Sequence, residues 1–453
     1  MNPYIFREYD IRGVVKEDFP EEVVVQLGKA FGTYVREKGG KTIALSGDIR
    51  LSTPALKRAF AEGLLATGVD VIDVGIVPTP VNYYSMVMLD VDGAVQITGS
   101  HNPSDMNGFK LSYEQKAVYG ADIQYLKSLI ETGKFASGAG RLLEKEILED
   151  YKKMVVSKIQ LERPVRLVMD CGNAAACLAA PEIYKAVGCE VTEIFCAVDG
   201  TFPNHHPDPT VKKNLKGLIA EVKKGGYDFG IAFDGDADRV GIVDDRGEII
   251  WADYIIILML DEIFAKYPGT AVVFDVKCSQ ALEEAIVEKG GRPIMWKTGH
   301  SLIKQKMREE NVPFSGEMSG HIFFRDDYYG FDDAIYVGLR FAQMVARLKE
   351  PLSQRMAKLP QYFSTPEMRL ECESDQVKFE IAQKAAEYFK AHYDCIDVDG
   401  VRIKFGDGWG LVRKSNTQPV IVTRFEAKTE QRLAEIKDLV LTKLQEFGKL
   451  KIA

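Results

Sequence analysis

The chain lacks the features that mark membrane, secreted and nucleic-acid-binding proteins. Its apolar run from Tyr254 to Leu260 is far too short to span a bilayer. Charged residues gather within positions 7–12, so we expect no signal peptide. The net charge of -8 argues against nucleic acid or an anionic membrane as a partner.

Cysteine is sparse and follows no metal-binding pattern. The 7 cysteines are scattered, and no C-x-x-C spacing occurs, so none resembles a zinc ligand. We expect reduced, mostly buried thiols and a cytoplasmic location. The remaining composition, 46% hydrophobic and 27% charged, is that of an ordinary globular protein. The 453 residues suggest about three domains, with four possible.

A cluster of acidic residues lies between two apolar stretches of strand length, 227–233 and 240–243. Asp234, Asp236 and Asp238 occupy alternate positions. Carboxylates this close repel one another and raise each other's pKa values unless a cation joins them. Oxygen ligands suit Mg²⁺ or Ca²⁺ and not zinc. Arg239 follows at once, and a divalent metal beside a guanidinium suits a site that handles phosphate.

Two other interpretations of the acidic cluster compete with a metal–phosphate site. An EF-hand loop needs Gly at its sixth position and Glu at its twelfth. Arg239 and Asp245 stand there, and strands replace the flanking helices, so the pattern excludes that loop. A solvated acidic turn, the usual fate of a charge run, stays open on this motif alone.

A pattern of strand, helix, strand and polar loop recurs three times along the chain. This predicts three related α/β units. Ligands of open α/β sheets bind at the carboxyl ends of strands, so we expect the three loops to converge on one cleft. The first strands are 41–48, 165–170 and 271–275, the polar loops end the segments 94–103, 229–239 and 312–321, and a helix over 21–37 precedes the first unit.

The C-terminal part has a different order of elements, which predicts a separate α+β domain. We expect strands over 367–373, 400–405 and 420–425, and helices over 378–392 and 429–447. Loops are expected at 406–410 and 413–419 between the last two strands.

The loop from Thr98 to Pro103 places Ser100 at a strand end, after a glycine and before a proline. Such a loop presents a nucleophile outward. Beside a metal site the serine fits a phosphate carrier, because a phosphoserine brings close to two negative charges. Asn107-Gly108 predicts a tight turn. Lys110 on the returning strand is either a phosphoryl ligand or an exposed strand lysine.

Two further segments carry groups suited to a sugar phosphate. In the loop 316–321, an extended backbone would point Glu317 and Ser319 the same way, toward adjacent sugar hydroxyls. His321 is a candidate acid or base. The loop 298–300 is similar but weaker. The segment 413–417 is rich in phosphate donors, although a solvated loop is the alternative.

Taken together, these motifs resemble the α-D-phosphohexomutases over the whole chain, most closely their bacterial phosphomannomutase/phosphoglucomutase branch. The resemblance rests on FREYDIRG at 6–13, TGSHNP at 98–103, NGFK at 107–110, FPNHHPDP at 202–209, DGDADR at 234–239, GEMSGH at 316–321 and RKSNTQP at 413–419.

This resemblance implies three similar mixed α/β domains and a C-terminal α+β domain around one central cleft. We place their boundaries at 1–150, 151–253, 254–363 and 364–453. It also implies that Ser100 is phosphorylated and passes its phosphoryl group to a hexose phosphate. The resulting hexose 1,6-bisphosphate turns around and returns its other phosphoryl group to Ser100. Glucose 1,6-bisphosphate is then both activator and intermediate.

The resemblance also assigns roles to individual residues. Mg²⁺ would be held by Ser100 as phosphoserine and by Asp234, Asp236 and Asp238. Proton transfer and charge stabilisation would fall to Arg12, Lys110 and His321, with Arg239 beside the phosphoserine. Substrate contacts would come from Glu317, Ser319, Arg413, Ser415, Asn416 and Thr417, with Tyr9, Lys277 and His300 as secondary candidates.

GEMSGH resembles the loop of enzymes that accept both mannose and glucose phosphates. A phosphoglucosamine mutase, a sugar phosphatase and a non-catalytic sugar-phosphate-binding protein remain as alternatives. Whether the chain is a monomer or a dimer stays open.

Overall fold

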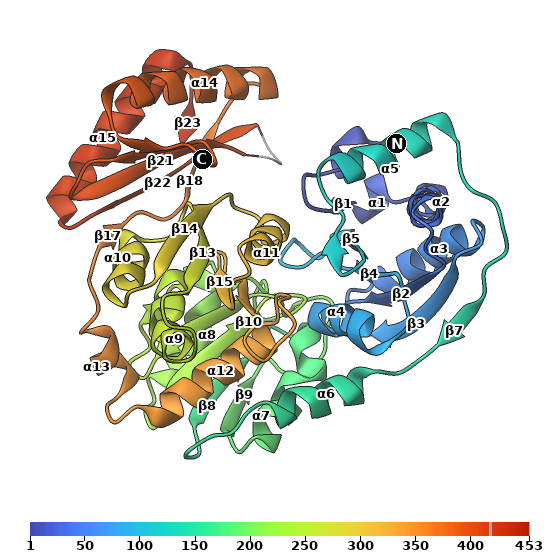
Figure 1. The fold of residues 1–453 in the computed structure, drawn as a ribbon, viewed down its shortest axis with the longest axis horizontal. Helices are drawn as coiled ribbons and strands as arrows, with labels where there is room; N and C mark the ends of the chain where they lie inside the picture. Colours follow the sequence, from blue (N-terminus) through green and yellow to red (C-terminus); the bar gives the residue numbers. More distant parts are fainter. Residues whose placement is uncertain (416–418, 453) are drawn as a thin grey trace. The chain divides into compact units, whose positions relative to one another are not determined.

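The structure is a computed structural model that describes residues 1–415 and 419–452 (Figure 1). The chain forms two compact units, residues 1–252 with 319–353 and residues 253–318 with 354–453. The chain passes from one unit to the other within helix α9 (Ala252–Lys266), between Met318 and Ser319, and within helix α13 (Leu352–Met356). Three α/β sheets precede a C-terminal antiparallel sheet, which confirms the predicted fold class. Asn416 and Thr417 lie outside the described residues.

The first sheet is mixed, with strand order β1-β5-β4-β2-β3-β7 and β6 paired to β5. Strands β4, β2, β3 and β7 run parallel, and β5 runs antiparallel to both β1 and β4. Its elements are η1 (Pro3–Ile5), β1 (Ile11–Val14), α1 (Val15–Asp18), α2 (Glu21–Glu37), β2 (Thr42–Gly47), α3 (Thr53–Leu65), β3 (Asp70–Ile76), α4 (Thr79–Met88), β4 (Gly93–Ile97), β5 (Met106–Tyr113), β6 (Lys116–Ala117), α5 (Ala121–Thr132) and β7 (Leu142–Glu144).

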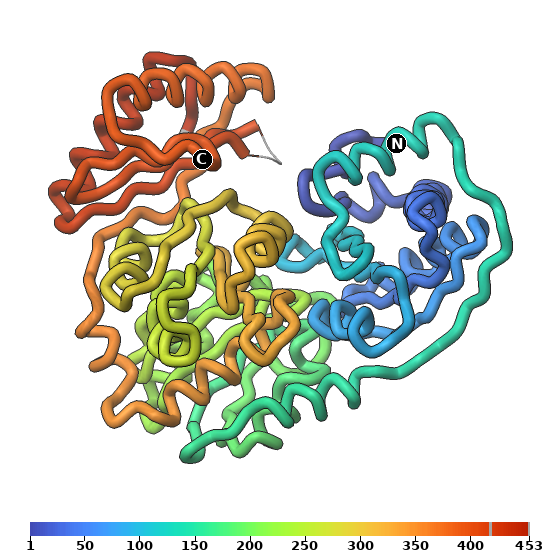
Figure 2. Tube along the Cα trace, viewed as in Figure 1, coloured from blue at the N-terminus to red at the C-terminus, as the bar shows by residue number. Residues whose placement is uncertain are grey.

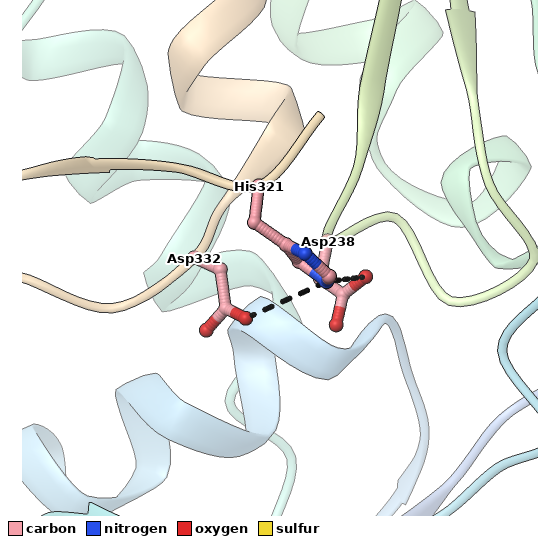
Figure 3. Close-up of side chains that lie close together, drawn as sticks. All are labelled: Asp238, His321 and Asp332. Carbon is pink, nitrogen blue, oxygen red and sulfur yellow. Dashed lines mark ion pairs between the residues drawn. The ribbon is translucent and has the colours of Figure 1, made fainter. Parts of the chain in front are cut away.

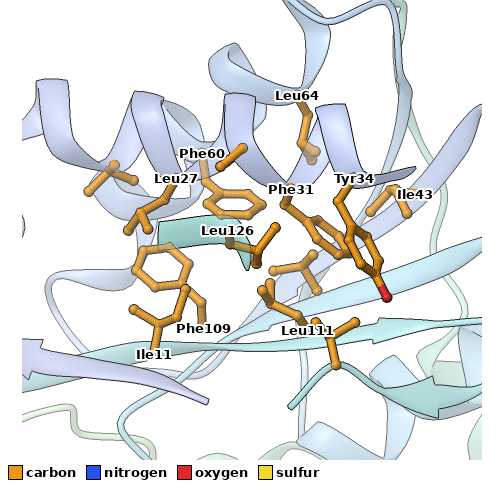
Figure 4. Close-up of a cluster of buried hydrophobic side chains, with 14 of the residues drawn as sticks. Ile11, Leu27, Phe31, Tyr34, Ile43, Phe60, Leu64, Phe109, Leu111 and Leu126 are labelled. Atoms are coloured by element: carbon orange, nitrogen blue, oxygen red, sulfur yellow. The ribbon is translucent and has the colours of Figure 1, made fainter. Parts of the chain in front are cut away.

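A hydrophobic core lies between this sheet and helices α2, α3 and α5 (Figure 4). The helix predicted over 21–37 is α2, and its apolar face supplies Phe31. The Phe60 ring stacks on that of Phe109 from β5, with centroids 5.0 Å apart. Aromatic side chains of this size bury large apolar areas, which anchors the helices to the sheet.

The second sheet, with order β12-β11-β10-β8-β9, carries the acidic loop. β10 and β11 pair antiparallel on either side of that loop, as predicted, while β10, β8 and β9 are parallel. The remaining elements of the first unit are α6 (Leu148–Ser157), β8 (Arg166–Asp170), η2 (Ala175–Leu178), α7 (Ala180–Ala186), β9 (Glu190–Ile194), η3 (Lys212–Leu215), α8 (Lys216–Val222), β10 (Phe229–Phe233), β11 (Val240–Asp244), β12 (Ile249–Ile250), β16 (Ile322–Phe324) and α12 (Ala334–Arg347).

In the trace of Figure 2, an extended stretch that contains β7 joins α5 to α6.

In the second unit, strands β14, β13 and β15 form a parallel arrangement, and the C-terminal strands form an antiparallel sheet with order β19-β20-β21-β22-β18-β23. β17 pairs with β22. The elements are β13 (Ala271–Asp275), α10 (Gln280–Glu288), β14 (Arg292–Trp296), α11 (His300–Glu309), β15 (Phe314–Gly316), β17 (Phe363–Ser364), β18 (Met368–Glu371), α14 (Asp375–His392), β19 (Cys395–Ile396), β20 (Val401–Lys404), β21 (Gly408–Lys414), β22 (Val420–Ala427), α15 (Glu430–Phe447) and β23 (Lys451–Ile452).

Two local predictions were wrong. Gly408–Lys414 is strand β21, so Arg413 lies on a strand and not in a loop. The glycines that suggested a loop sit in tight packing, since a Cβ at Gly408 would lie 2.4 Å from the carbonyl oxygen of Glu426. Likewise Asn107-Gly108 lies inside β5 and not in a turn. A Cβ at Gly108 would lie 2.4 Å from the Ile11 oxygen, so this glycine permits close backbone approach.

Within the ranges 1–415 and 419–452, no helix combines the length and apolar character needed to cross a membrane. The cysteines are free thiols, as predicted.

Helix α12 begins at a buried carboxylate. Asp333 caps the helix by accepting the backbone N–H of Tyr336 at 2.9 Å. Its oxygens also accept the hydroxyls of Tyr151 and Tyr328. Burial raises the pKa of Asp333 to about 6, against 3.8 in its ordinary state, and these hydrogen bonds only partly offset that effect.

A raised folded-state pKa makes Asp333 a pH-dependent element of stability. Its favourable contribution is complete below about pH 4 and is lost as the pH rises through 6. We predict that the free energy of unfolding of Asp333→Asn, relative to that of the parent, increases from pH 4 to pH 7 by on the order of 1–3 kcal/mol. Urea unfolding at several pH values measures this. Asp150→Asn, at an exposed position on α6, is the control. A difference in unfolding free energy between Asp333→Asn and the parent that does not change with pH contradicts the prediction.

Candidate functional site

Ser100 follows the carboxyl end of β4 in a strained backbone conformation, with φ of +47°. It is 1% exposed. Its hydroxyl donates to Oδ2 of Asp234 at 2.8 Å and lies 3.1 Å from Nδ1 of His101. The side chain of the predicted phosphate carrier is therefore directed at the acidic loop.

The acidic loop folds around its first carboxylate. Oδ1 of Asp234 accepts the backbone N–H groups of Asp238 and Arg239, each at 3.1 Å. Ala237 adopts a left-handed φ of +64°, which tightens the turn. A Cβ at Gly235 would lie 2.1 Å from the carbonyl oxygen of Ser100, so only glycine allows the two loops to approach this closely.

Asp234, Asp236 and Asp238 are each 0% exposed, which excludes the solvated acidic turn. Lys110, at 6% exposed, excludes the exposed-lysine alternative. Its ammonium group donates to Oδ2 of Asp236 at 2.7 Å and also to Asp238. The Thr79 hydroxyl donates to the same oxygen of Asp236 at 2.6 Å.

The close packing of these charges shifts their pKa values in opposite directions. Burial, with the charges of Asp238 and Asp236, raises the pKa of Asp234 well above its usual value. Burial acts the same way on Asp238, but Lys110 and His321 outweigh it and hold the pKa of Asp238 well below the usual range. Burial would lower the pKa of Lys110, yet Asp236 and Asp238 raise it overall.

The three aspartates fit a hard cation. Each offers one oxygen, and these oxygens lie within 4.8 Å of one another. Oδ1 of Asp236 is buried and has no hydrogen-bond partner among the residues that the structure describes. A buried carboxylate oxygen without a partner is costly unless a cation binds it, and an all-oxygen set suits Mg²⁺.

His321 lies against the same cluster (Figure 3). Its Nε2 is 3.3 Å from Oδ1 of Asp238 and 4.0 Å from Oδ2 of Asp332. Arg239 approaches the same nitrogen with its Nε at 3.3 Å, and the Ser319 hydroxyl lies 2.9 Å from Nδ1. The structure thus brings His321, Arg239 and Ser319 to the acidic loop.

Arg12 reaches the serine loop from β1. Its Nη1 donates to the carbonyl oxygen of Gly99 at 3.3 Å, and its Nε pairs with Asp10 at 2.6 Å. Burial lowers the pKa of Arg12, but Asp10 and Asp236 raise it overall, so it stays charged. Tyr9 is half-buried beside Asp10 in the same segment.

Two further residues belong to this site, His101 and Asp332, and the sequence motifs did not predict a role for either. Burial and the charges of Arg239 and Arg12 lower the pKa of His101 well below its usual value, so its imidazole beside Ser100 is neutral. The adjacency of His101 to Ser100 was a usable signal. Asp332 lies near His321 only because of the fold. In the sequence, its only signal was the pair of adjacent aspartates at 332–333.

In the second unit, Asp275 at the end of β13 accepts hydrogen bonds from both predicted sugar-binding segments. Its Oδ1 accepts the backbone N–H of Met318 and its Oδ2 accepts the Thr298 hydroxyl, each at 3.0 Å. Glu317 accepts the backbone N–H of Gly299 at 2.5 Å, just before His300 opens helix α11.

Two of the predicted substrate-binding cations, Lys277 and Arg413, are paired with carboxylates. Lys277 lies 3.3 Å from Glu367, and this lysine is the main cause that lowers the pKa of Glu367 to about 2. Arg413 pairs with Asp399 at 3.0 Å. Lys378 donates to the carbonyl oxygen of Ser415 at 2.9 Å.

Family models for four successive domains match the chain in order. Their descriptions are phosphoglucomutase/phosphomannomutase alpha/beta/alpha domains I, II and III and the C-terminal domain, over residues 3–137, 145–247, 251–363 and 367–443. The chain belongs to the phosphoglucomutase/phosphomannomutase family.

Relatives match along almost the full chain. A phosphomannomutase/phosphoglucomutase of Pseudomonas putida is 43% identical over 443 residues, covering 97% of this chain and 95% of the relative. A phosphoglucomutase of Neisseria meningitidis is 42% identical, covering 96% and 95%. The crystal structure of a phosphoglucomutase/phosphomannomutase family protein from Burkholderia thailandensis is 42% identical with a TM-score of 0.94, covering 99% of each chain.

We predict that Asp236→Asn weakens Mg²⁺ binding at least about 10-fold, because it removes a charged ligand oxygen from the buried cluster. Titration calorimetry with MgCl₂ measures the affinity. The matched control is Asp244→Asn, at the opposite end of β11, which should bind Mg²⁺ as the parent does. Equal affinities for parent and Asp236→Asn contradict the assignment.

Proposed function

We propose that this chain is an isomerase that interconverts mannose 1-phosphate with mannose 6-phosphate and glucose 1-phosphate with glucose 6-phosphate. A phosphoserine at Ser100 and a hexose 1,6-bisphosphate intermediate carry the reaction. Family membership and the full-length relatives support the reaction class.

The observation that carries the proposal is the contact of Ser100 with Asp234 in a buried acidic cluster. A phosphate on Ser100 adds nearly two negative charges to three carboxylates. Mg²⁺ held by Ser100, Asp234, Asp236 and Asp238 would neutralise this charge and polarise the phosphoryl group.

The chain's own cations then surround the phosphoryl group. Transfer breaks the bond between phosphorus and the Ser100 oxygen and forms one to a sugar hydroxyl, whose proton goes to a base. Arg12, Lys110, Arg239 and His321 stabilise the charge and move the proton. Return of the other phosphoryl group to Ser100 leaves the isomeric monophosphate.

Substrate recognition falls to residues on several separate segments of the chain. Glu317 and Ser319 read sugar hydroxyls, and Arg413 with its neighbours grips the phosphate that does not react. The proposed substrate-binding set is Tyr9, Lys277, His300, Glu317, Ser319, Arg413, Ser415, Asn416 and Thr417. We place the domains at 1–150, 151–253, 254–363 and 364–453, and the free cysteines support a cytoplasmic location.

We predict mutase activity on mannose 1-phosphate and on glucose 1-phosphate, with Mg²⁺ and a trace of glucose 1,6-bisphosphate present. Coupled assays that detect each 6-phosphate measure it. Ser100→Ala should abolish turnover on both sugars, at least about 1000-fold, because it removes the nucleophile. Ser104→Ala, at an exposed position of the same loop, is the matched control and should keep parental rates.

Other outcomes separate the alternatives. Activity on glucosamine 1-phosphate alone would keep the mechanism and overturn the assigned sugar specificity. Release of inorganic phosphate without isomerisation would identify a phosphatase. No turnover of any of the three sugars would contradict the proposed function.

A further inference from the structure

A buried arginine, Arg50, lies directly behind the serine loop. Strands β2 and β4 are parallel neighbours, with Gly47 opposite Ile97, so the segments that follow them emerge side by side. Asp48 and Arg50 follow β2, and Ser100 follows β4. Arg50 is 1% exposed, so its guanidinium faces protein and not solvent.

The guanidinium of Arg50 binds the backbone of the serine loop at four points. Its Nη2 donates to the carbonyl oxygens of Ser100 at 2.8 Å and Asn102 at 2.6 Å. Its Nη1 donates to those of Pro103 at 2.6 Å and Met106 at 2.9 Å. The planar fork of an arginine can satisfy four acceptors in fixed directions at once.

Asp48 holds the other end of the same loop. Its Oδ2 accepts the Thr98 hydroxyl at 2.7 Å and the backbone N–H of Gly99 at 3.2 Å. The Thr98 oxygen in turn accepts the backbone N–H of Ser100 at 2.8 Å. Asp48 and Arg50 also form a buried ion pair, with Oδ2 and Nε 3.3 Å apart.

These contacts fix the peptide groups on both sides of Ser100. A left-handed φ is strained for a non-glycine residue and persists only where the surroundings impose it. Thr98 restrains the N–H of Ser100, and Arg50 restrains its carbonyl group. With the backbone held at φ of +47°, the hydroxyl is directed at Asp234.

We propose that Arg50, supported by Asp48, is a positioning residue for phosphoryl transfer at Ser100. Arg50 touches no reacting atom and acts through the backbone of the serine loop. The proposal rests on the proposed role of Ser100 as phosphoryl carrier. Burying the Asp48–Arg50 ion pair costs desolvation free energy. In this loop the pair fixes the direction of the Ser100 hydroxyl.

The test compares Arg50→Lys with the parent. Lysine keeps the positive charge but has a single nitrogen, which cannot reach four carbonyls in these directions. Misplacing a reacting group by about 1 Å costs roughly 100-fold in rate, so we expect kcat to fall by about that factor. The KM for glucose 1-phosphate should change less than about 3-fold, because the sugar-binding loops are untouched. Arg58→Lys, at an exposed position on α3, is the matched control.

Phosphorylation of Ser100 distinguishes positioning from partial unfolding. With labelled glucose 1,6-bisphosphate, a positioning defect gives full final labelling of Arg50→Lys at a rate reduced as much as kcat. Parental kinetics in Arg50→Lys, or a reduced labelled fraction that reacts at the parental rate, would overturn the proposal. A parent enzyme that is never labelled at Ser100 would instead overturn the proposed function on which this inference rests.

Thr98 gives a second test that leaves Arg50 in place, in case Arg50→Lys does not fold. Thr98→Val keeps the shape but removes the hydroxyl between Asp48 and the N–H of Ser100. We expect kcat to fall without a matching rise in KM, and Thr98→Ser to restore most of the lost rate. Equal kcat values for Thr98→Val and Thr98→Ser would overturn the proposed positioning of Ser100.

Discussion

The structure depends on burying three carboxylates and a serine hydroxyl at one point. Asp234, Asp236 and Asp238 are removed from water, and Lys110 offsets part of their repulsion. The loops must then meet at backbone distance, which Gly235 permits. An unpartnered oxygen of Asp236 among the described residues makes a bound cation the natural completion of the cluster.

The first two sheets, both in the first unit, position the two loops that bring these charged and polar groups together. Parallel strands place the Ser100 loop beside the segment of Asp48 and Arg50, and an antiparallel pair holds the acidic loop. Rigid strands fix the ends of both loops, so side-chain hydrogen bonds need only set the last few torsions. This division suits a phosphate carrier, because a small error in the direction of its hydroxyl has a large effect on rate.

Local motifs predicted the parts of this site that are continuous in sequence. The alternating aspartates between apolar stretches predicted the acidic loop, whose three carboxylates are buried together, and the Gly-Ser pattern predicted the serine whose hydroxyl contacts it. Arg50, His101 and Asp332 were missed, because their roles depend on contacts across the fold. Gly108 and Gly408 were interpreted as turn or loop residues, although close backbone packing explains both. Residues 416–417 of the predicted phosphate loop lie outside the described residues.

Anomalous diffraction from crystals soaked in Mn²⁺ would show directly whether the three aspartates bind a divalent cation beside Ser100. Two buried clusters compete for a cation, Asp234 with Asp236 and Asp238, and Asp238 with His321 and Asp332. We expect one peak on the oxygens of the first cluster, beside the Ser100 hydroxyl. A peak held by His321 and Asp332, or none on the three aspartates at saturating Mn²⁺, would contradict it.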